Sequence, residues 1–334
     1  MSAAPHPSPP QSAAEPPTAD PAAPPVLAEV VRSGFVEGRH RGSLVELAAD
    51  GTVRRALGDV TSPFFPRSSN KPMQAAAILR AGAELDGEDL AMAAASHAGE
   101  AFHRARTAAV LSAHGFAEDD LICPPDLPGD PEEVERVLAA GGGRTRLAMN
   151  CSGKHAAMLV ACAANGWTTA DYTDPDHPLQ RLVRETLEEL SGEEIAHTGV
   201  DGCGAPLMAI SLTGLARAFR AHVLADPGTP ERRVADAMRA HPEYIGGTRR
   251  EDTRLMRELP GVLAKAGAEG VQAVALADGR ALAFKIEDGA GRARGPVLAA
   301  ALAAMGVEHP VLEGIAEAPL LGGGRPVGSV RAIV

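Results

Sequence analysis

Aromatic residues are scarce in this sequence of 334 residues, since Phe, Trp and Tyr together make up only 3%. Apolar residues reach 45%, so the chain has enough of them for a large core, and we expect Ala, Leu and Val to build it. Long apolar runs are also absent. None approaches the roughly 18 residues that a helix needs to cross a bilayer. These features predict a soluble globular protein that is not embedded in a membrane.

Positive charge and cysteine are limited as well. The net charge of −11 argues against nonspecific binding to nucleic acid or to an anionic membrane, because both need clustered Lys and Arg. Four cysteines are too few for a disulfide scaffold in a chain of this length. The first residues lack the basic and apolar regions of a signal peptide. We therefore expect a cytoplasmic protein, in which a cysteine is more often a ligand or a buried thiol than half of a disulfide.

The order of patterns along the chain predicts an α+β fold. Residues 1–25 are rich in Pro and Ala and are expected to form a disordered tail, so the fold begins near Val26. A hairpin is predicted around "ADG" at 49–51, two adjacent antiparallel strands within 259–289, and a final strand near 323–334. Helices are predicted at 71–80, on both sides of a break at 96–99, and at 132–140, 153–165, 177–191 and, as the last helix, 294–305. Strands at both chain ends predict one antiparallel sheet built from both ends and packed against helices.

Five short polar stretches stand out within apolar surroundings. They are "RSSNK" (67–71), "ASHAGE" (95–100), "NCSGKH" (150–155), "DGCGAP" (201–206) and "AKAGAEG" (264–270). Four of them contain glycine, which lets the backbone approach a ligand closely. Any one of the five could be an ordinary turn, but together they favour a functional site.

The first stretch places Lys71 three residues after Ser68. At this spacing two side chains meet on one face of a helix. A serine hydroxyl is a poor nucleophile unless a base removes its proton, and a lysine with a lowered pKa can act as that base. The plainer alternative is that Ser68 caps a helix and Lys71 is solvated.

Two other stretches supply thiols. Cys151 is followed by Lys154 and His155 one helical turn later, and Cys203 comes from a distant segment. Two thiolates and one nitrogen would make a three-ligand metal site with an open position. The spacing is not that of a C-x-x-C pair, so two buried thiols remain the alternative. The other two cysteines, at 123 and 162, are expected to be packing residues.

Six stretches, "RSSNKPMQA", "ASHAGE", "NCSGKHAAML", "TDPDHPLQ", "VDGCGAPL" and "LAKAGAEGV", resemble in order the L-asparaginase II family of the rhizobial type. The resemblance runs from about residue 27 to the C-terminus and implies one catalytic domain at 26–334. It implies a fold like that of serine β-lactamases and penicillin-binding proteins. It also implies hydrolysis of L-asparagine to L-aspartate and ammonia, usually by a homodimer.

The resemblance also implies the site residues. It gives two Ser–Lys pairs, Ser68 with Lys71 and Ser96 with Lys265, and Zn²⁺ held by a further set of three residues. The zinc ligands are Cys151, Lys154 and Cys203, with His155 beside them. Substrate binding is assigned to one residue from each of the five polar stretches: Arg67, His97, Asn150, Asp201 and Gly267. In this scheme Ser68 attacks the amide and Lys71 takes its proton. Repulsion between the two lysines and their burial would lower at least one lysine pKa.

Two positions depart from the family pattern. Asn70 stands where we expect an apolar residue, and Arg249 stands where the family often has glycine. If position 249 needs positive φ, an arginine there would be strained. Its side chain could also reach the substrate pocket. Two other functions therefore stay open. One is a serine β-lactamase or peptidase, and the other is a non-catalytic protein that binds zinc or a metabolite.

Overall fold

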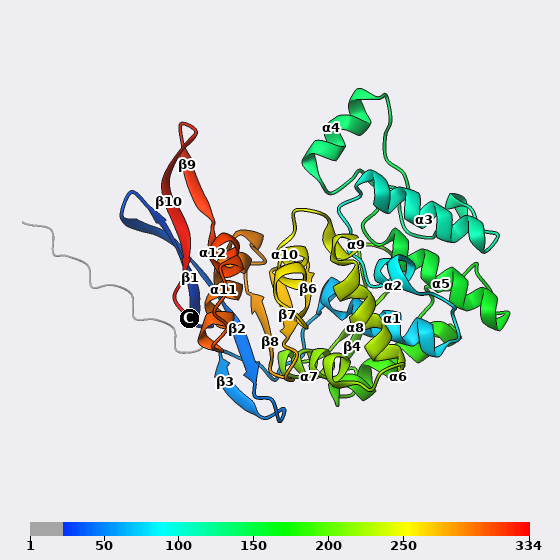
Figure 1. Cartoon of the computed structure of the whole chain (residues 1–334), viewed down its shortest axis with the longest axis horizontal. Helices are drawn as coiled ribbons and strands as arrows, with labels where there is room; N and C mark the ends of the chain where they lie inside the picture. Colours follow the sequence, from blue (N-terminus) through cyan, green and yellow to red (C-terminus); the bar gives the residue numbers. More distant parts are fainter. Residues whose placement is uncertain (1–22) are drawn as a thin grey trace, which may run out of the picture.

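The computed structural model describes residues 23–334, and within this range one large antiparallel sheet lies at one end and most helices at the other (Figure 1). The sheet has eight strands in the order β6-β7-β8-β2-β1-β10-β9, with β3 also paired to β2. Its strands are β1 (Val26–Arg32), β2 (Phe35–Leu47), β3 (Val53–Leu57), β6 (Leu263–Gly267), β7 (Val271–Ala275), β8 (Ala281–Ile286), β9 (Pro319–Gly322) and β10 (Arg325–Ala332). A separate pair is formed by β4 (His197–Val200) and β5 (Pro206–Ala209).

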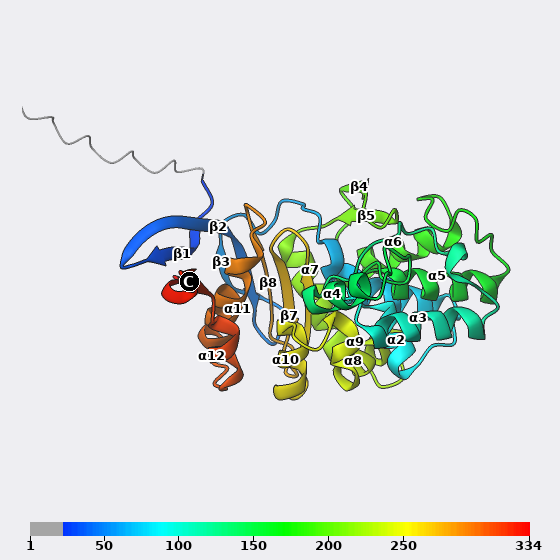
Figure 2. The same cartoon turned by 90° about the horizontal axis from the view of Figure 1, so that it is seen from above.

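The two chain ends meet within this sheet, one strand in from the edge strand β9. Strand β1 pairs antiparallel with β10, so that Val30 lies opposite Val330. Strand β2 is long, and its C-terminal half is buried because it pairs with both β3 and β8. Its N-terminal half pairs with β1 and extends away from the helices (Figure 2). The predicted α+β fold, with an antiparallel sheet made from both chain ends and packed against helices, is confirmed.

The helices divide into those that cover the sheet and those that form the helical half. Helices α7 and α11 both pack against β7, which is buried along its whole length. The helices are α1 (Lys71–Arg80), α2 (Gly87–Ala93), α3 (Ala101–Ala113), α4 (Pro131–Ala139), α5 (Ser152–Asn165), α6 (Pro178–Ser191), α7 (Leu212–Leu224), α8 (Pro230–Ala240), α9 (Pro242–Gly246), α10 (Glu251–Glu258), α11 (Arg294–Ala304) and α12 (Val311–Ala316). Short 3-10 turns η1 (Arg67–Asn70), η2 (Glu118–Asp120) and η3 (Gly291–Ala293) connect some of them.

Several sequence predictions need correction near the C-terminus. The segment 259–289 contains three strands, β6 to β8, where two were predicted, because both "GAEG" and "ADG" make tight turns between short strands. Helix α11 is not the last helix, since α12 and then β9 follow it. The predicted tail lies outside the described residues up to residue 22, and the first strand begins at Val26 as predicted.

The core has the predicted composition. Within residues 23–334 the buried side chains are mostly Ala, Leu and Val, and the only aromatic residues fully buried there are Tyr172, Phe219 and Phe284. All four cysteines are buried and free of disulfide bonds. In residues 23–334 no helix combines the length and the apolar character that a membrane span requires.

Candidate active site

Ser68 lies where the helical half meets the edge of the sheet. The turn η1 carries it and packs against β6 and β7 before leading into α1. Arg67 has a φ of 52°, in the left-handed region that residues other than glycine seldom adopt. Its Nε donates a hydrogen bond of 2.9 Å to Oδ1 of Asp201. Ser69 is buried and donates 2.7 Å to the carbonyl of Pro66, so both neighbours of Ser68 are fixed.

Gly267, at the end of β6, lies against the segment that carries Ser68. A Cβ atom at this position would be 2.5 Å from the carbonyl oxygen of Pro66 and 3.3 Å from the backbone nitrogen of Ser69. Backbone atoms cannot move aside as a side chain can. Glycine is therefore the residue that lets β6 approach the serine this closely.

A cavity of about 200 Å³ lies at this junction. Its lining includes six of the predicted site residues: Ser68, Ser96, His97, Asn150, Lys265 and Gly267. The predicted residues that do not line it are Arg67, Lys71, Cys151, Lys154, Asp201 and Cys203. Sequence analysis missed four charged lining residues: Arg250, Glu251, Asp252 and Arg294. Three of these belong to "GGTRRED" (246–252), in which only Arg249 had been considered.

Lys71 is buried beneath the cavity and contacts the second serine instead of the first. Its Nζ donates to Ala95 O, to Ser96 Oγ at 2.9 Å and to Cys151 Sγ at 3.0 Å. These three bonds use the three hydrogens of an ammonium group. In the described part of the chain no hydrogen bond joins Lys71 to Ser68. The predicted Ser68–Lys71 contact is thus replaced by a Lys71–Ser96 contact, because a buried amine needs acceptors and these three supply them.

Lys265 is buried in β6 and lines the cavity. Burial lowers the pKa of its amine to about 7, with a smaller lowering from Lys71, while the carboxylate of Asp252 acts in the opposite direction. Asp252 is held by the backbone N–H of Ala266 at 2.7 Å and by Nε2 of Gln272 at 2.9 Å. The Lys265 amine donates 2.8 Å to Ala266 O, and no hydrogen bond to Ser96 occurs among residues 23–334. A substantial fraction of Lys265 is therefore neutral near pH 7, as a general base must be.

Lysine is rare in this chain, which has four lysines among its 32 Lys and Arg residues. Three of the four, Lys71, Lys154 and Lys265, are buried around this site, and only Lys285 lies elsewhere. Arginine cannot lose its proton in a protein, whereas a buried lysine can. The chain thus places its titratable amines almost entirely at this site.

A cluster of thiols lies beside Lys71. The sulfur atoms of Cys151 and Cys203 and a carboxylate oxygen of Asp201 all lie within 4.8 Å of one another. Lys154 Nζ is 3.3 Å from Cys203 Sγ. The hydrogen bond between the Cys151 and Cys203 side chains lowers the pKa of Cys203. The same hydrogen bond, together with burial, raises the pKa of Cys151. Burial is the largest single influence on Lys154 and lowers its pKa, but Cys203, Cys151 and Asp201 together outweigh burial, so the Lys154 pKa is raised.

The donors of this cluster fit a zinc ion. His155 is fully buried, and its Nδ1 lies 2.8 Å from the hydroxyl of Tyr172. Its other ring nitrogen, Nε2, is buried without a hydrogen-bond partner in the described residues, which is costly unless another group binds it. Thiolates, imidazole nitrogen and carboxylate are the donors that zinc prefers. The remaining cysteines, at 123 and 162, have pKa values raised to about 11, chiefly by burial, as expected for packing residues.

The predicted substrate-binding residues have unequal freedom to contact a ligand. Both ring nitrogens of His97 are engaged, with Gly99 N–H donating to Nδ1 at 3.2 Å and Nε2 lying 2.9 Å from Ser152 Oγ. Burial holds the pKa of His97 well below its usual value, so the ring is neutral. Asn150 is exposed and lines the cavity, and its Oδ1 accepts a hydrogen bond from the Cys151 thiol at 2.9 Å.

The two departures from the family pattern do not disturb the cavity. Arg249 is not among the described residues with positive φ, so the expected strain is absent, and the positive φ of 125° belongs to Gly247. The guanidinium of Arg249 binds Asp130 and Glu132, and Arg249 does not line the cavity. Asn70 is buried directly before α1.

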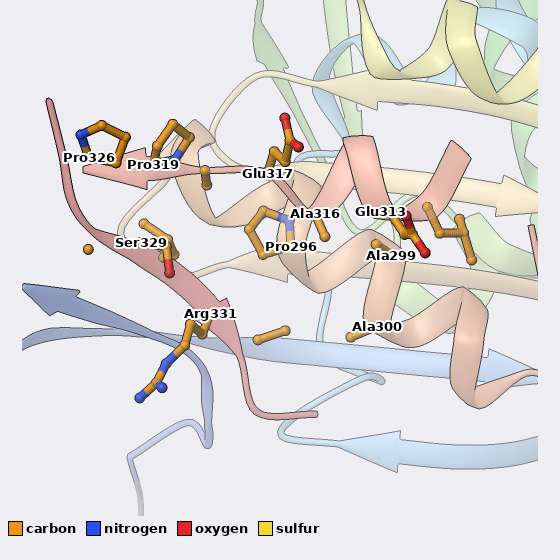
Figure 3. Close-up of a pocket in the computed structure, with 15 residues that line it drawn as sticks. Pro296, Ala299, Ala300, Glu313, Ala316, Glu317, Pro319, Pro326, Ser329 and Arg331 are labelled. Atoms are coloured by element: carbon orange, nitrogen blue, oxygen red, sulfur yellow. The ribbon is translucent and has the colours of Figure 1, made fainter. Parts of the chain in front are cut away.

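A larger cavity of about 850 Å³ lies elsewhere, between helices α11 and α12 and strands β9 and β10 (Figure 3). Its wall is mostly Pro, Ala and Val, with Glu313, Glu317 and Arg331 as its charged side chains. None of the predicted site residues lines it. This second cavity therefore lies apart from the candidate active site, with which it shares no lining residue.

Comparisons with known proteins give one family and several distant structures. The family described as L-asparaginase II matches residues 28–332. No curated protein matches the sequence. The solved structure of Mglu in its native form has 16% sequence identity and a TM-score of 0.42, covering 83% of this chain and 67% of that chain. A β-lactamase from Mycobacterium bovis has 13% identity, coverages of 75% and 88%, and a TM-score of 0.38. EstCE1, a hydrolase with promiscuous acyltransferase activity, has 14% identity, coverages of 73% and 88%, and a TM-score of 0.39.

Proposed function

The chain belongs to the L-asparaginase II family, and we propose that it hydrolyses L-asparagine to L-aspartate and ammonia. Family membership makes it an asparaginase-like amidohydrolase with a small amide as substrate. The observation that carries the specific proposal is the position of Lys265. Its amine, with a pKa of about 7, lines the same cavity as Ser68.

In the proposed reaction Ser68 is the nucleophile and Lys265 is the base. Ser68 Oγ attacks the side-chain amide carbon, and its proton passes to the neutral amine of Lys265. The C–N bond then breaks as Lys265 returns the proton to the leaving nitrogen, which departs as ammonia. Ser68 now carries an aspartyl ester. Water attacks this ester and gives its proton to Lys265, and the proton returns to Oγ as the C–O bond to Ser68 breaks.

Lys71 has a different part in this proposal from the one that the sequence suggested. All three hydrogens of its ammonium are engaged, so we assign it to holding Ser96 in place and supplying positive charge beneath the cavity. The tetrahedral intermediate needs hydrogen-bond donors for its oxyanion, and the backbone N–H of Ser68 is one candidate.

We propose that zinc is bound beside this site by Cys151, Lys154 and Cys203. His155, whose Nε2 has no hydrogen-bond partner within residues 23–334, and the carboxylate of Asp201 lie next to these ligands and support the assignment. When bound, zinc would supply a positive charge that can orient an anionic group. Lys154 must lose its proton to coordinate the metal, which makes metal binding depend on pH. The homodimer and the cytoplasmic location remain predictions.

The test is ammonia release from L-asparagine by two adjacent variants. Ser68→Ala is expected to abolish it, because the nucleophile is lost. Ser69→Ala is the matched control and is expected to keep much of the activity, since Ser69 only donates to Pro66 O. An active Ser68 variant with an inactive Ser69 variant would contradict the assignment. Hydrolysis of nitrocefin without ammonia release from L-asparagine would favour the β-lactamase alternative.

A further inference from the structure

One arginine side chain of the cavity, that of Arg250, has no partner among the residues that the structure describes. Besides Lys265, four charged residues line the cavity, and two of them pair with each other, since Arg294 Nη2 donates 3.1 Å to Glu251 Oε2. Asp252 is held by a backbone N–H and by a glutamine amide. For Arg250 no ion pair and no side-chain hydrogen bond occur within residues 23–334. Its guanidinium donors are therefore free to bind a ligand.

The position of Arg250 keeps this guanidinium at the cavity. Arg250 directly precedes α10, and a Cβ at Gly246 would lie 3.0 Å from its Cγ. A Cβ at Gly129, another lining residue, would lie 3.9 Å from its Nη2. Arg250 is also among the cations that lower the pKa of Lys265, so its charge is felt at the reactive amine.

The neighbouring arginine differs in both respects. The guanidinium of Arg249 binds Asp130 and Glu132, and its side chain does not line the cavity. Two consecutive arginines, both largely exposed, thus have opposite situations. Arg249 is neutralised by two carboxylates, whereas Arg250 has no carboxylate partner in the described part of the chain.

We propose that Arg250 binds the α-carboxylate of the amino acid substrate and so selects for substrates that carry one. This inference rests on the proposed function, in which the substrate presents its amide to Ser68 and its carboxylate elsewhere in the cavity. A guanidinium matches a carboxylate in a bidentate, charge-assisted pair, so it fixes orientation as well as charge. A neutral amide lacking this carboxylate would leave Arg250 unpaired.

The test compares Arg250→Gln with the matched control Arg249→Gln on two amides. These are L-asparagine and 3-aminopropanamide, which keeps the amide and the amine but lacks the α-carboxylate. Arg250→Gln is expected to lower kcat/KM for L-asparagine roughly 10- to 100-fold, mainly through KM, as loss of a charge-assisted hydrogen bond does. The same variant should leave kcat/KM for 3-aminopropanamide within about twofold of the wild-type value. Arg249→Gln should change kcat/KM by no more than about twofold for either substrate.

Calorimetric binding of L-aspartate gives a readout that does not depend on turnover. Weaker binding to Arg250→Gln than to the wild type supports the inference even if the wild type releases no ammonia, an outcome that would overturn only the proposed function. Equal L-aspartate binding by both proteins would overturn the inference and would place the carboxylate on another group, such as the zinc site. An equal loss of activity on both amides would also overturn it, because Arg250 would then act without regard to the carboxylate.

Discussion

Replacing Lys265 with methionine is expected to make the protein more stable at low pH while abolishing its activity. Lys265 is buried in β6, where an ammonium group is poorly solvated. Methionine has a similar length and no charge, so it fills the space and removes the cost of burying the charge. The stabilisation is then a direct measure of how strongly the site resists protonation.

The size of this effect follows from the two pKa values. The Lys265 amine has a pKa of about 7 in the folded protein, against 10.5 for an ordinary lysine in the unfolded chain. Each pH unit between these values corresponds to about 1.36 kcal/mol, so the full penalty is about 5 kcal/mol. Between pH 7 and 10.5 the unfolded chain holds one proton more than the folded protein, so wild-type stability rises with pH. The variant should thus be more stable by about 5 kcal/mol at pH 6, about 3 at pH 8 and under about 1 at pH 10.

Urea unfolding of both proteins, followed by circular dichroism at these three pH values, measures the difference. Lys285→Met removes the one lysine outside the site, a half-buried residue in β8, and serves as the control. A Lys265→Met difference as small at pH 6 as at pH 10 would refute the reasoning. It would mean that the amine is solvated or paired in the folded protein and is not poised to act as a base.

Four further outcomes are expected. In the wild type, kcat/KM should rise with pH through about 7 as Lys265 deprotonates, towards an optimum at roughly pH 8 to 9. A kcat/KM profile that is flat from roughly pH 5 to 9, or that falls as pH rises through about 7, would exclude a neutral-lysine base. Because Lys71 also interacts with Lys265, the apparent pKa of that profile belongs to the group. Elemental analysis should find about one zinc per chain in protein purified without chelator, and Cys151→Ser or Cys203→Ser should lose it; absence of zinc from the wild type would contradict the site. Lys154→Met should also lose the metal, whereas retention there with loss in His155→Ala would make the histidine the third ligand.

The local parts of the fold were predictable because local rules dominate them. Helix α1 begins and ends at the predicted residues, since an alanine-rich run follows a short turn and Pro72 fits its first turn. The predicted helix at 177–191 corresponds to α6, and Gly192 directly after it adopts the left-handed conformation that commonly ends a helix. The strand count at 259–289 was wrong because a five-residue strand between two tight turns resembles part of a longer one.

Half of the twelve predicted site residues line one cavity in the structure, and their contacts there differ from those that spacing suggested. Six residues chosen from the polar stretches line one cavity, but the partner of Lys71 depends on where its long side chain finds acceptors, which spacing along the chain does not determine. Arg250 and Asp252 were missed because their segment was judged by Arg249 alone. One feature of the composition would have helped. In a chain that otherwise uses arginine, a lysine is itself a reason to suspect amine chemistry.

The pairing of β1 with β10 also has a consequence for how the chain folds. Val30 and Val330 lie opposite each other although 300 residues separate them in sequence. During synthesis β1 is made long before β10, so the edge of β1 that faces β10 stays uncovered until β10 has been made. An uncovered strand edge can pair with other chains. Contacts this distant in sequence also form slowly, because the ends of a long loop must first meet. We expect the helical half to assemble without this delay, because its segments lie closer together in sequence, and we expect the pairing of β1 with β10 to form late.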